Sequence, residues 1–374
     1  MIAITGMGCV TGFGTGVPAL EAGLRRGASA LRAWYRDAFA YARVPGIDDD
    51  RTDRCAMLLE LAINEALNGA GLHEVAAPLP LLVGSTHGEL GDWEARFDPE
   101  STACWAAPAM PVVRSAALQG RARQMPFSVT TACTASAHAL AYAGAQIRAG
   151  LVDRVVVAGG DVVSDFLMQG FVALRAMSRA GCTPFAAGRE GISLGEGAAA
   201  LVVERADAAQ ARGAEPLAYV TGVGCATDAF RLTAPEPSGQ AMSRAILMSM
   251  GERRDAPDFI NVHGTGSELN DSMEYHALAR VFGERLRDVR VSATKNATGH
   301  TCGAAAALEL IICILALQGA VTPGILGTAA VDEQFEHLAQ GASASSTRKQ
   351  PATAVTMNCA FGGSNTAVFV ERAV

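Results

Sequence analysis

The sequence contains very little lysine and few aromatic residues. Only two of its thirty basic residues are lysines, Lys295 and Lys349, and aromatic residues make up 6% of the chain. Its formal net charge is −7. Proteins that bind nucleic acid carry a basic patch or a basic excess, which this balance of charge does not supply. We therefore expect no nucleic-acid partner.

The sequence also shows no secretion signal, no membrane-spanning run and no pair of cysteines at metal-binding spacing. It opens like a core strand, and the apolar stretch 304–318 contains Glu309 and is too short to cross a bilayer. The nine cysteines are scattered without a C-x-x-C pair. This pattern excludes a disulfide framework and a structural zinc site, and it favours a reducing compartment. We expect a cytoplasmic protein with no membrane partner.

Two short motifs occur twice, in the same order. Thr-Gly-x-Gly-Cys-x-Thr is found at residues 5–11 and again at 221–227, and a Val-Glu-Arg-Ala ending closes both 201–206 and 368–373. Two echoes in matching order indicate that one unit is duplicated along the chain. The chain is long enough for both copies to share a large buried core.

Apolar strands alternate with helical patterns in both halves. The expected strands are 79–84, 154–160, 259–262 and 290–293, and the expected helices are 54–70, 135–149, 271–282 and 302–317. This alternation predicts an α/β fold with helices covering the sheets. The Gly- and Pro-containing stretch 212–216 is the natural joint. We therefore predict an N-terminal half, 1–215, and a C-terminal half, 216–374.

Cys133 stands between two kinds of pattern. The β-branched stretch 126–131 before it predicts a strand, and the alanine-rich stretch 135–149 after it predicts a helix. The free N–H groups and the dipole at a helix N-terminus stabilise a thiolate. Cys133 is thus a candidate nucleophile in the N-terminal half. The alternative is a small buried cysteine with a packing role.

Two histidines in the C-terminal half occupy similar positions. His263 and His300 each follow an apolar strand and lie among Gly and Thr residues, which let a ligand approach the backbone closely. Lys295 lies five residues before His300 in a chain that otherwise uses arginine almost exclusively. These three residues are candidates for a catalytic site. Structural histidines and a solvated lysine are the alternatives.

One cysteine and two histidines suit thioester chemistry. A thiolate attacks an acyl carbonyl and retains the acyl group, while neutral imidazoles donate hydrogen bonds to a developing oxyanion. The same residues could bind a metal, but they lack paired ligand spacing and an evident fourth ligand. A Cys-His hydrolase is another possibility. It needs one histidine and an orienting Asn or Asp, and it leaves the second histidine unexplained.

These candidate residues belong to four short motifs that occur along the chain in a characteristic order. They are Thr131-Ala-Cys133-Thr-Ala, His263-Gly-Thr-Gly with Asn270-Asp271, Lys295-x-x-x-Gly299-His300 with Gly303-Ala-Ala305, and Phe361-Gly-Gly363-x-Asn365. With these motifs the chain resembles the β-ketoacyl synthases of the thiolase superfamily, of the elongating Cys-His-His type. The resemblance covers nearly the whole chain. It implies a thiolase-like fold, a duplicated five-layer α/β/α/β/α unit, which agrees with the internal repeat.

The resemblance also implies roles for individual residues. Cys133 would accept the acyl chain, and the backbone N–H groups of Cys133 and Phe361 would form the oxyanion hole for that transfer. His263 and His300 would polarise the malonyl thioester carbonyl and stabilise the enolate as carbon dioxide leaves. Phe361, in a loop flanked by glycines, would gate the acyl pocket.

Further implications concern the surroundings and the partners. Lys295 would hold His300 and tune the local charge, with Glu309 behind it. No organic cofactor or metal would be needed. The partners would be acyl carrier protein and acyl and malonyl thioesters, in fatty acid or rather polyketide- or polyene-type secondary metabolism. The protein would be a homodimer, or a heterodimer with a related synthase subunit.

A carrier protein presents an acidic helix, so a basic dock is expected on the synthase. Arg51, Arg54, Arg121 and Arg123 are the candidates, and solvated surface arginines are the alternative. Two other functions remain open. A chain-length-factor-like subunit would usually lose the cysteine that this chain keeps. A coenzyme A-dependent thiolase would need a different set of residues around the second histidine.

The sequence departs from the family pattern at three places. The chain is shortened near 95–125. The gate reads Cys359-Ala360-Phe361 where Phe-Gly-Phe is usual, and Ala186 stands in place of the usual Asp after Pro-Phe. The smaller Cys359 should open space, and Ala360 should restrict the backbone. We expect altered acyl selectivity or gating, as in a specialised synthase.

Overall fold

The repeated glycine motif forms two matching strands, β1 (Ile2–Thr11) and β9 (Ala218–Thr227). Thr5 in β1 and Thr221 in β9 are both bulged out of register with the neighbouring strand. The next glycine in each lies directly under a helix: a Cβ on Gly6 would come within 2.0 Å of the Ala66 carbonyl oxygen, and one on Gly222 within 1.9 Å of a carbonyl oxygen. Close strand–helix packing therefore explains why the motif is repeated.

The structure is a computed structural model, and it describes residues 1–36, 38–48, 53–72, 79–88, 90, 127–335, 338 and 350–373. Its N-terminal strands also include β2 (Gly14–Thr15), β5 (Leu81–Gly84), β6 (Phe127–Val129), β7 (Arg154–Asp161) and β8 (Gly197–Arg205). The C-terminal strands also include β10 (Phe259–Asn261), β11 (Arg290–Ser292), β12 (Thr353–Ala360) and β13 (Ser364–Arg372). A separate hairpin pairs β3 (Leu31–Tyr35) with β4 (Phe39–Ala42).

The two halves share one strand order. It is β6–β5–β7–β8–β1 in the N-terminal half and β11–β10–β12–β13–β9 in the C-terminal half, with β2 paired to β1. Directions match as well: the outer three strands of each half run parallel, and the next two pairings are antiparallel. The halves join edge to edge, because Ile2–Ile4 of β1 pairs with Ala218–Val220 of β9.

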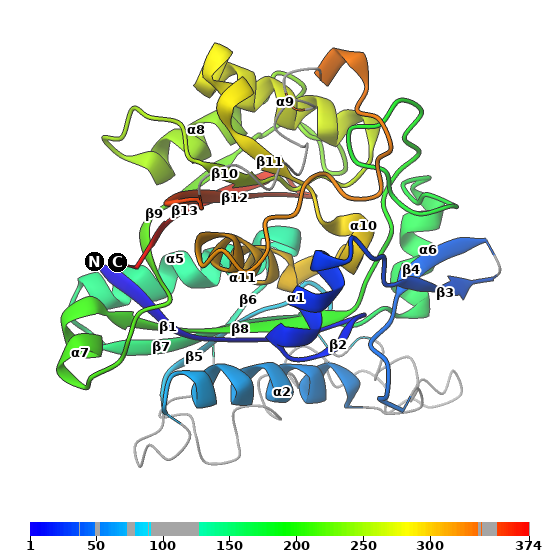
Figure 1. Cartoon of the computed structure of the whole chain (residues 1–374). Coiled ribbons are helices and arrows are strands. Elements are labelled where there is room, and N and C mark those ends of the chain that lie inside the picture. Colours follow the sequence, from blue (N-terminus) through cyan, green and yellow to red (C-terminus); the bar gives the residue numbers. More distant parts are fainter. Residues whose placement is uncertain are drawn as a thin grey trace.

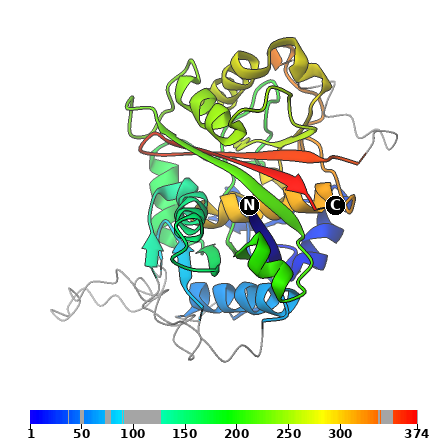
Figure 2. The same cartoon turned by 90° about the vertical axis from the view of Figure 1, so that its left-hand side faces the viewer.

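The two halves of this continuous sheet form two layers, which we call the two sheets. Helices cover both sheets and fill the space between them. The principal helices are α2 (Arg54–Gly69), α5 (Ala135–Arg148), α8 (Gln240–Met250), α9 (Glu268–Phe282) and α11 (Ala305–Leu317). Figure 1 shows α2 outside one sheet, α5 and α11 between the sheets, and α8 and α9 outside the other, and Figure 2 gives the same layers from the side. This is the α/β/α/β/α layering of the thiolase-like fold that the sequence predicted.

Helix α11 explains the most apolar stretch of the sequence. Every one of its residues is buried, because both of its sides face a sheet. Sequence and structure agree closely along the chain; the helix expected at 135–149 is α5, and the one expected at 54–70 is α2. No helix of the described residues is both long and apolar enough to cross a membrane.

The shorter elements complete the described fold. The α-helices are α1 (Val17–Arg25), α6 (Asp165–Ala173), α7 (Ala206–Ala211) and α10 (Lys295–Thr298). The 3-10 helices are η2 (Ala132–Thr134), η3 (Gly283–Asp288), η4 (Cys302–Ala304) and η5 (Glu333–Phe335). The stretch 95–125, where the sequence suggested a shortening, lies outside the described residues.

Candidate active site

Cys133 lies in the sharp turn η2 between β6 and α5, as the sequence predicted. Ala132 before it has a φ of +50°, a left-handed conformation that residues other than glycine rarely adopt. The turn is held by the Thr134 hydroxyl, which donates to the carbonyl oxygen of Thr131 at 2.7 Å. The turn places Cys133 just before the first turn of α5, with its side chain buried.

The Cys133 thiol is protonated at neutral pH. Burial raises its pKa to about 12; Lys295 opposes the increase and Asp161 adds to it. The sequence led us to expect a thiolate stabilised by the helix N-terminus. The raised pKa runs against that expectation, because the loss of water around the sulfur opposes the effect of the helix end. A nucleophilic role for this sulfur would then require the proton to leave during the attack.

His300 is the immediate neighbour of the sulfur. Its Nε2 lies 3.0 Å from Cys133 Sγ, and its Nδ1 accepts a hydrogen bond from the backbone N–H of Cys302 at 3.3 Å. A backbone amide can only donate, so Nδ1 is unprotonated and the proton resides on Nε2. His300 therefore directs an N–H donor at the catalytic sulfur.

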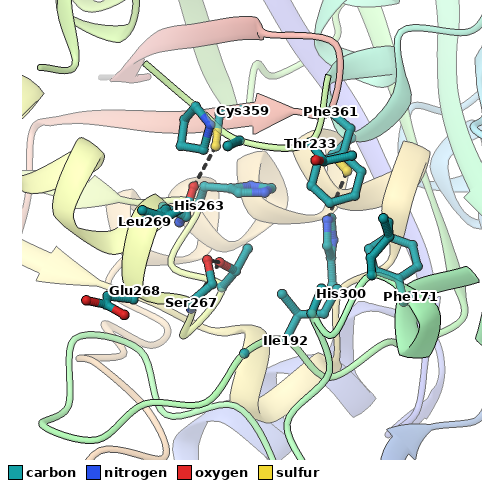
Figure 3. Close-up of a pocket in the computed structure, with 18 of the residues that line it drawn as sticks. Phe171, Ile192, Thr233, His263, Ser267, Glu268, Leu269, His300, Cys359 and Phe361 are labelled. Atoms are coloured by element: carbon teal, nitrogen blue, oxygen red, sulfur yellow. Dashed lines mark hydrogen bonds between the residues drawn. The ribbon is translucent and has the colours of Figure 1, made fainter. Parts of the chain in front are cut away.

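His263 completes the site from the loop after β10. Its Nδ1 lies 3.4 Å from the amide nitrogen of Asn358 on β12, which is also a donor, so this ring too carries its proton on Nε2. The two imidazole rings meet edge to face with centroids 5.0 Å apart. Figure 3 shows both rings directed into the same space below Phe361. The site thus presents two neutral N–H donors beside one thiol.

Burial keeps both imidazoles neutral. It is the main cause that lowers the pKa of His263 and of His300 well below the ordinary value, and the charge of Lys295 lowers both further. A neutral imidazole still carries one ring N–H, which it can donate to an oxyanion. The arrangement therefore suits stabilisation of negative charge on a thioester oxygen.

Lys295 holds His263 rather than His300. Its ammonium donates to the carboxylate of Glu309 and, at 2.5 Å, to the backbone carbonyl oxygen of His263. The predicted contact with His300 is wrong, because the lysine side chain runs from α10 toward α11 and the loop after β10. Burial is the main cause of the lowered pKa of His300, and the charge of Lys295 lowers that pKa further without a hydrogen bond. Glu309 is the predicted residue behind it.

Sequence analysis missed two residues that hold His263. Asn358 donates to Glu309 at 2.6 Å as well as to the His263 ring. Glu274 on α9 accepts from the backbone N–H groups of His263 and Gly264 at 2.6 and 2.7 Å. The signal for Glu274 was present: it is an acidic residue on the buried face of a helix, next to the apolar Met273. No comparable sequence signal marked Asn358, because a single amide side chain near the end of a strand is common.

A cavity of about 350 Å³ opens above these residues. Its lining includes Cys133, His263 and His300 at the bottom and Phe171 and Phe361 toward the mouth. The two phenyl rings are stacked with centroids 5.6 Å apart, and Phe361 remains 40% exposed. Figure 3 shows the pair beside His300. Phe361 is therefore placed where a gate to the sulfur would stand, as the sequence suggested.

The altered gate residues form part of this wall. The thiol of Cys359 donates to the side-chain oxygen of Asn270 at 2.7 Å, as Figure 3 shows for Cys359. Ala360 ends β12 in extended conformation, where alanine is as suitable as glycine. Near Ala186, Arg189 donates to the Ala186 carbonyl oxygen at 3.0 Å and pairs with Asp332 at 3.5 Å. Asp332 thus provides a carboxylate close to the position that lacks its usual Asp.

Arg54 is not available to a partner. Its side chain is 5% exposed and forms an ion pair with the equally buried Glu196. Its remaining N–H groups donate to backbone carbonyl oxygens, among them that of Val44. The prediction that Arg54 docks carrier protein is therefore wrong, because a buried guanidinium with these bonds serves packing. Arg51, Arg121 and Arg123 lie outside the described residues.

The same three side chains could in principle bind a metal. One ligand atom from each of Cys133, His263 and His300 lies within 4.8 Å of the others. Histidines that ligate a metal usually donate their other ring nitrogen to an acceptor. Here Cys302 and Asn358 donate to both Nδ1 atoms, which leaves protons on the Nε2 atoms facing the sulfur. The hydrogen bonds thus favour an oxyanion over a cation.

Comparison with known proteins identifies the family of the chain. The family model described as "Beta-ketoacyl synthase, N-terminal domain" matches residues 40–209, and "Beta-ketoacyl synthase, C-terminal domain" matches 217–329. Nodulation protein E of Rhizobium meliloti (strain 1021) is 36% identical over 86% of this chain and 87% of its own length. 3-Oxoacyl-[acyl-carrier-protein] synthase 2 of Coxiella burnetii is 35% identical over 55% of this chain and 52% of its own.

Solved structures agree as well. The ishigamide ketosynthase/chain length factor matches with a TM-score of 0.88 and 29% identity over 99% of this chain and 98% of that one. A β-ketoacyl synthase from Burkholderia phymatum STM815 matches with a TM-score of 0.84 and 26% identity over 100% and 99%. The chain therefore belongs to the β-ketoacyl synthase family of condensing acyltransferases, with the thiolase-like fold of that family.

Proposed function

We propose that the chain catalyses the decarboxylative Claisen condensation of an acyl-enzyme thioester with malonyl-acyl carrier protein. The observation that carries this proposal is the convergence of two protonated Nε2 atoms, from His263 and His300, on the space beside Cys133. A hydrolase would need a base at this place. Two N–H donors instead suit an enolate oxygen.

The first half-reaction loads the enzyme. The Cys133 sulfur attacks the carbonyl carbon of an acyl thioester, the bond to the carrier thiol breaks, and the thiol proton of Cys133 passes to the departing thiolate. The high pKa of Cys133 makes this transfer concerted with attack rather than a prior ionisation. The amides of Cys133 and Phe361 are the proposed donors to the tetrahedral oxyanion.

The second half-reaction forms the carbon–carbon bond. Malonyl thioester loses carbon dioxide, and the electron pair of the broken bond forms an enolate whose oxygen accepts from His263 and His300. The enolate carbon attacks the acyl carbonyl, the bond to sulfur breaks, and the Cys133 thiolate takes a proton from water. Lys295, Glu309 and Asn358 are buried together and keep His263 in place throughout.

Acyl carrier protein is the proposed donor of both thioesters. The mouth of the cavity exposes Leu174, Leu269 and Phe361, with Arg175 among them. Apolar side chains beside a cation suit an amphipathic acidic helix. Of the arginines suggested by sequence, Arg54 is buried and the other three lie outside the described residues, so this rim is the dock we propose among the described residues. The scattered, free cysteines of the described residues are in keeping with the cytoplasm as the site of action.

We further propose specialised polyketide- or polyene-type metabolism, with a homodimer or a related synthase subunit as partner. The changed gate at Cys359 and Ala360 and the similarity to the ishigamide ketosynthase/chain length factor support this choice. A chain-length-factor-like subunit remains the second candidate, favoured by that same similarity. Cys133, with His300 at 3.0 Å and His263 within 4.8 Å, favours the catalytic role.

The experiment is intact-protein mass spectrometry after incubation with a panel of acyl-carrier proteins, with wild type beside Cys133→Ala. An acyl mass gain in wild type alone, followed by its loss on addition of malonyl-carrier protein and release of a 3-oxoacyl product, is the expected result. A folded wild type that gains no mass from any donor contradicts an independent synthase. The same panel repeated with a related subunit then tests the heterodimer.

A further inference from the structure

The turn that carries Cys133 has a second copy after His300. Cys302 in η4 has a φ of +49°, against +50° for Ala132 in η2, and each turn leads directly into a central helix, α11 or α5. Gly303 occupies the position that corresponds to Cys133. The turns are also exchanged between halves: η2 packs against β12 and η4 against β7. The duplicated fold thus contains two equivalent turns, of which only η2 has a cysteine at this position.

The second turn holds a carboxylate that the condensation does not use. Asp161, the last residue of β7, is 1% exposed, and its Oδ2 accepts from the backbone N–H of Gly303 at 2.6 Å. It also accepts from the Ser85 hydroxyl at 2.8 Å and from the amides of Thr86 and His87 at 2.9 and 3.0 Å. Both carboxylate oxygens are therefore occupied by donors from two separate segments.

The Asp161 carboxylate binds the residue that directly follows Cys302, whose N–H fixes the tautomer of His300. Gly303 follows Cys302, and the N–H of Cys302 is the donor to His300 Nδ1. Cys302 keeps an unfavourable left-handed conformation, so the turn needs external support to stay in this shape. The approach is close: a Cβ on Gly303 would lie 2.8 Å from Asp161 Oδ2. Asp161 provides that support.

We propose that Asp161 is a positioning residue for the condensation step. Its carboxylate locks the η4 turn, the locked turn aims the Cys302 N–H at His300 Nδ1, and His300 consequently keeps its Nε2 proton directed at Cys133 and the enolate oxygen. The kinetic part of this proposal rests on the proposed function. The tautomer of His300 can be measured whether or not the protein condenses malonyl groups.

The central variant is Asp161→Asn in the full-length protein. An amide has nearly the same shape, but it places an NH₂ group against N–H donors that need an acceptor. Nitrogen-15 NMR of histidine-labelled protein, with His300 assigned by its loss in His300→Ala, reports which ring nitrogen is protonated. We expect a single Nε2–H form in wild type and a mixture in Asp161→Asn. Condensation should fall about 10²-fold, as for other small misplacements of catalytic groups.

Alkylation of Cys133 by iodoacetamide separates positioning from general damage. Asp161 also raises the pKa of Cys133 by its charge. Alkylation at pH 8 should therefore become several-fold faster in Asp161→Asn while condensation becomes slower. A merely structural role would also expose the sulfur and speed alkylation, but it predicts that condensation falls in step with thermal stability while His300 keeps its Nε2–H form in the folded fraction, and that result would overturn the proposal.

Two further variants keep the test decisive if Asp161→Asn folds poorly. Gly303→Ala changes no charge and places a Cβ 2.6 Å from Ser85 Cα and 2.8 Å from Asp161 Oδ2, so the η4 turn must shift. The tautomer should then become mixed while the alkylation rate stays within about twofold of wild type. Ser85→Ala removes one donor to Asp161 and leaves the Gly303 contact in place, so His300 should remain in its Nε2–H form. An unchanged tautomer in folded Asp161→Asn and Gly303→Ala overturns the proposal even if the protein proves to be no synthase.

Discussion

The two turns η2 and η4 share a left-handed residue that leads toward a helix, but they differ in the residue that follows it. In η2 the turn residue is Cys133, whose sulfur faces an open cavity; in η4 it is Gly303, whose amide is bonded to Asp161 from within the protein. The second turn shows that an amide in this position binds a carboxylate oxygen at 2.6 Å. The equivalent amide in the first turn is therefore well placed for a substrate oxyanion. In our proposals the first turn carries the nucleophile and the second turn positions His300.

Converting the first turn into the second gives the largest expected effect. Cys133→Gly leaves the η2 backbone able to form but removes the nucleophile, so acylation should disappear and condensation should fall by at least about 10³-fold. Intact-mass analysis with acyl-carrier protein measures the acylation. Cys225→Ala, at a half-buried position on β9, is the control and should acylate like wild type. Acyl mass gain in folded Cys133→Gly would assign the nucleophile elsewhere.

The buried pair beside the turns is expected to matter next. Lys295 and Glu309 are 1% and 4% exposed, so Lys295→Met leaves a carboxylate without its cation and should cost about 3–5 kcal/mol of stability in urea unfolding. The loss should shrink as the pH falls, because burial already raises the pKa of Glu309 and its protonated form carries no unpaired charge.

A double replacement separates stability from chemistry. Lys295→Met with Glu309→Gln removes both charges, so most of the stability should return, since uncharged pairs of similar size replace buried ion pairs without large loss. Condensation should stay low, because the His263 carbonyl oxygen still lacks its donor. Full recovery of condensation in the double variant would show that Lys295 acts only through folding.

The sequence contained the fold but only part of the site. The repeat at 5–11 and 221–227 marked two strands whose glycines pack under helices, a local requirement that leaves a visible pattern. Cys133, His263 and His300 were recognisable because each stands in a short motif at an element end. Glu309 was predicted beside Lys295, but the bond from Lys295 to the His263 carbonyl oxygen depends on how three elements pack together, which no local sequence pattern indicates.

Buried charges were the least predictable feature. Nothing in the sequence distinguishes Arg54 from the other arginines. Its ion pair with Glu196 exists only because the fold places the two side chains together. Asp161 ends an apolar strand, where an acidic residue ordinarily meets solvent, whereas here the duplicated turn of the other half covers it. Glu196, the partner of Arg54, and Gly303, the partner of Asp161, both come from distant segments of the chain. Composition and residue spacing therefore do not predict either contact.

The pH dependence of the reactivity of Cys133, in the turn η2, provides a smaller and more gradual effect to measure. The pKa of Cys133 is raised to about 12, so its thiolate fraction increases about tenfold per pH unit across the range in which the protein is handled. Iodoacetamide alkylation of Cys133 should rise from pH 7 to pH 9 without a plateau. The pKa values of His263 and His300 are lowered, so decarboxylation of malonyl-carrier protein should show no inflection near pH 6.5. An alkylation plateau below pH 8 would show a thiolate that the helix end does stabilise.

The smallest expected effect concerns the end of β12, which η2 contacts and which corresponds to the end of β7 at Asp161. Ala360→Gly restores the flexible gate beside Phe361, whose stacking on Phe171 is worth only about 1 kcal/mol. Since Ala360 is already in extended conformation, its replacement changes how easily the gate opens rather than its resting shape. We expect a few-fold change in turnover and a shift toward longer acyl chains, measured by competition among carrier-bound acyl groups. Unchanged turnover and unchanged chain-length preference would remove Ala360 from the gate and leave selectivity to Cys359 and its bond to Asn270.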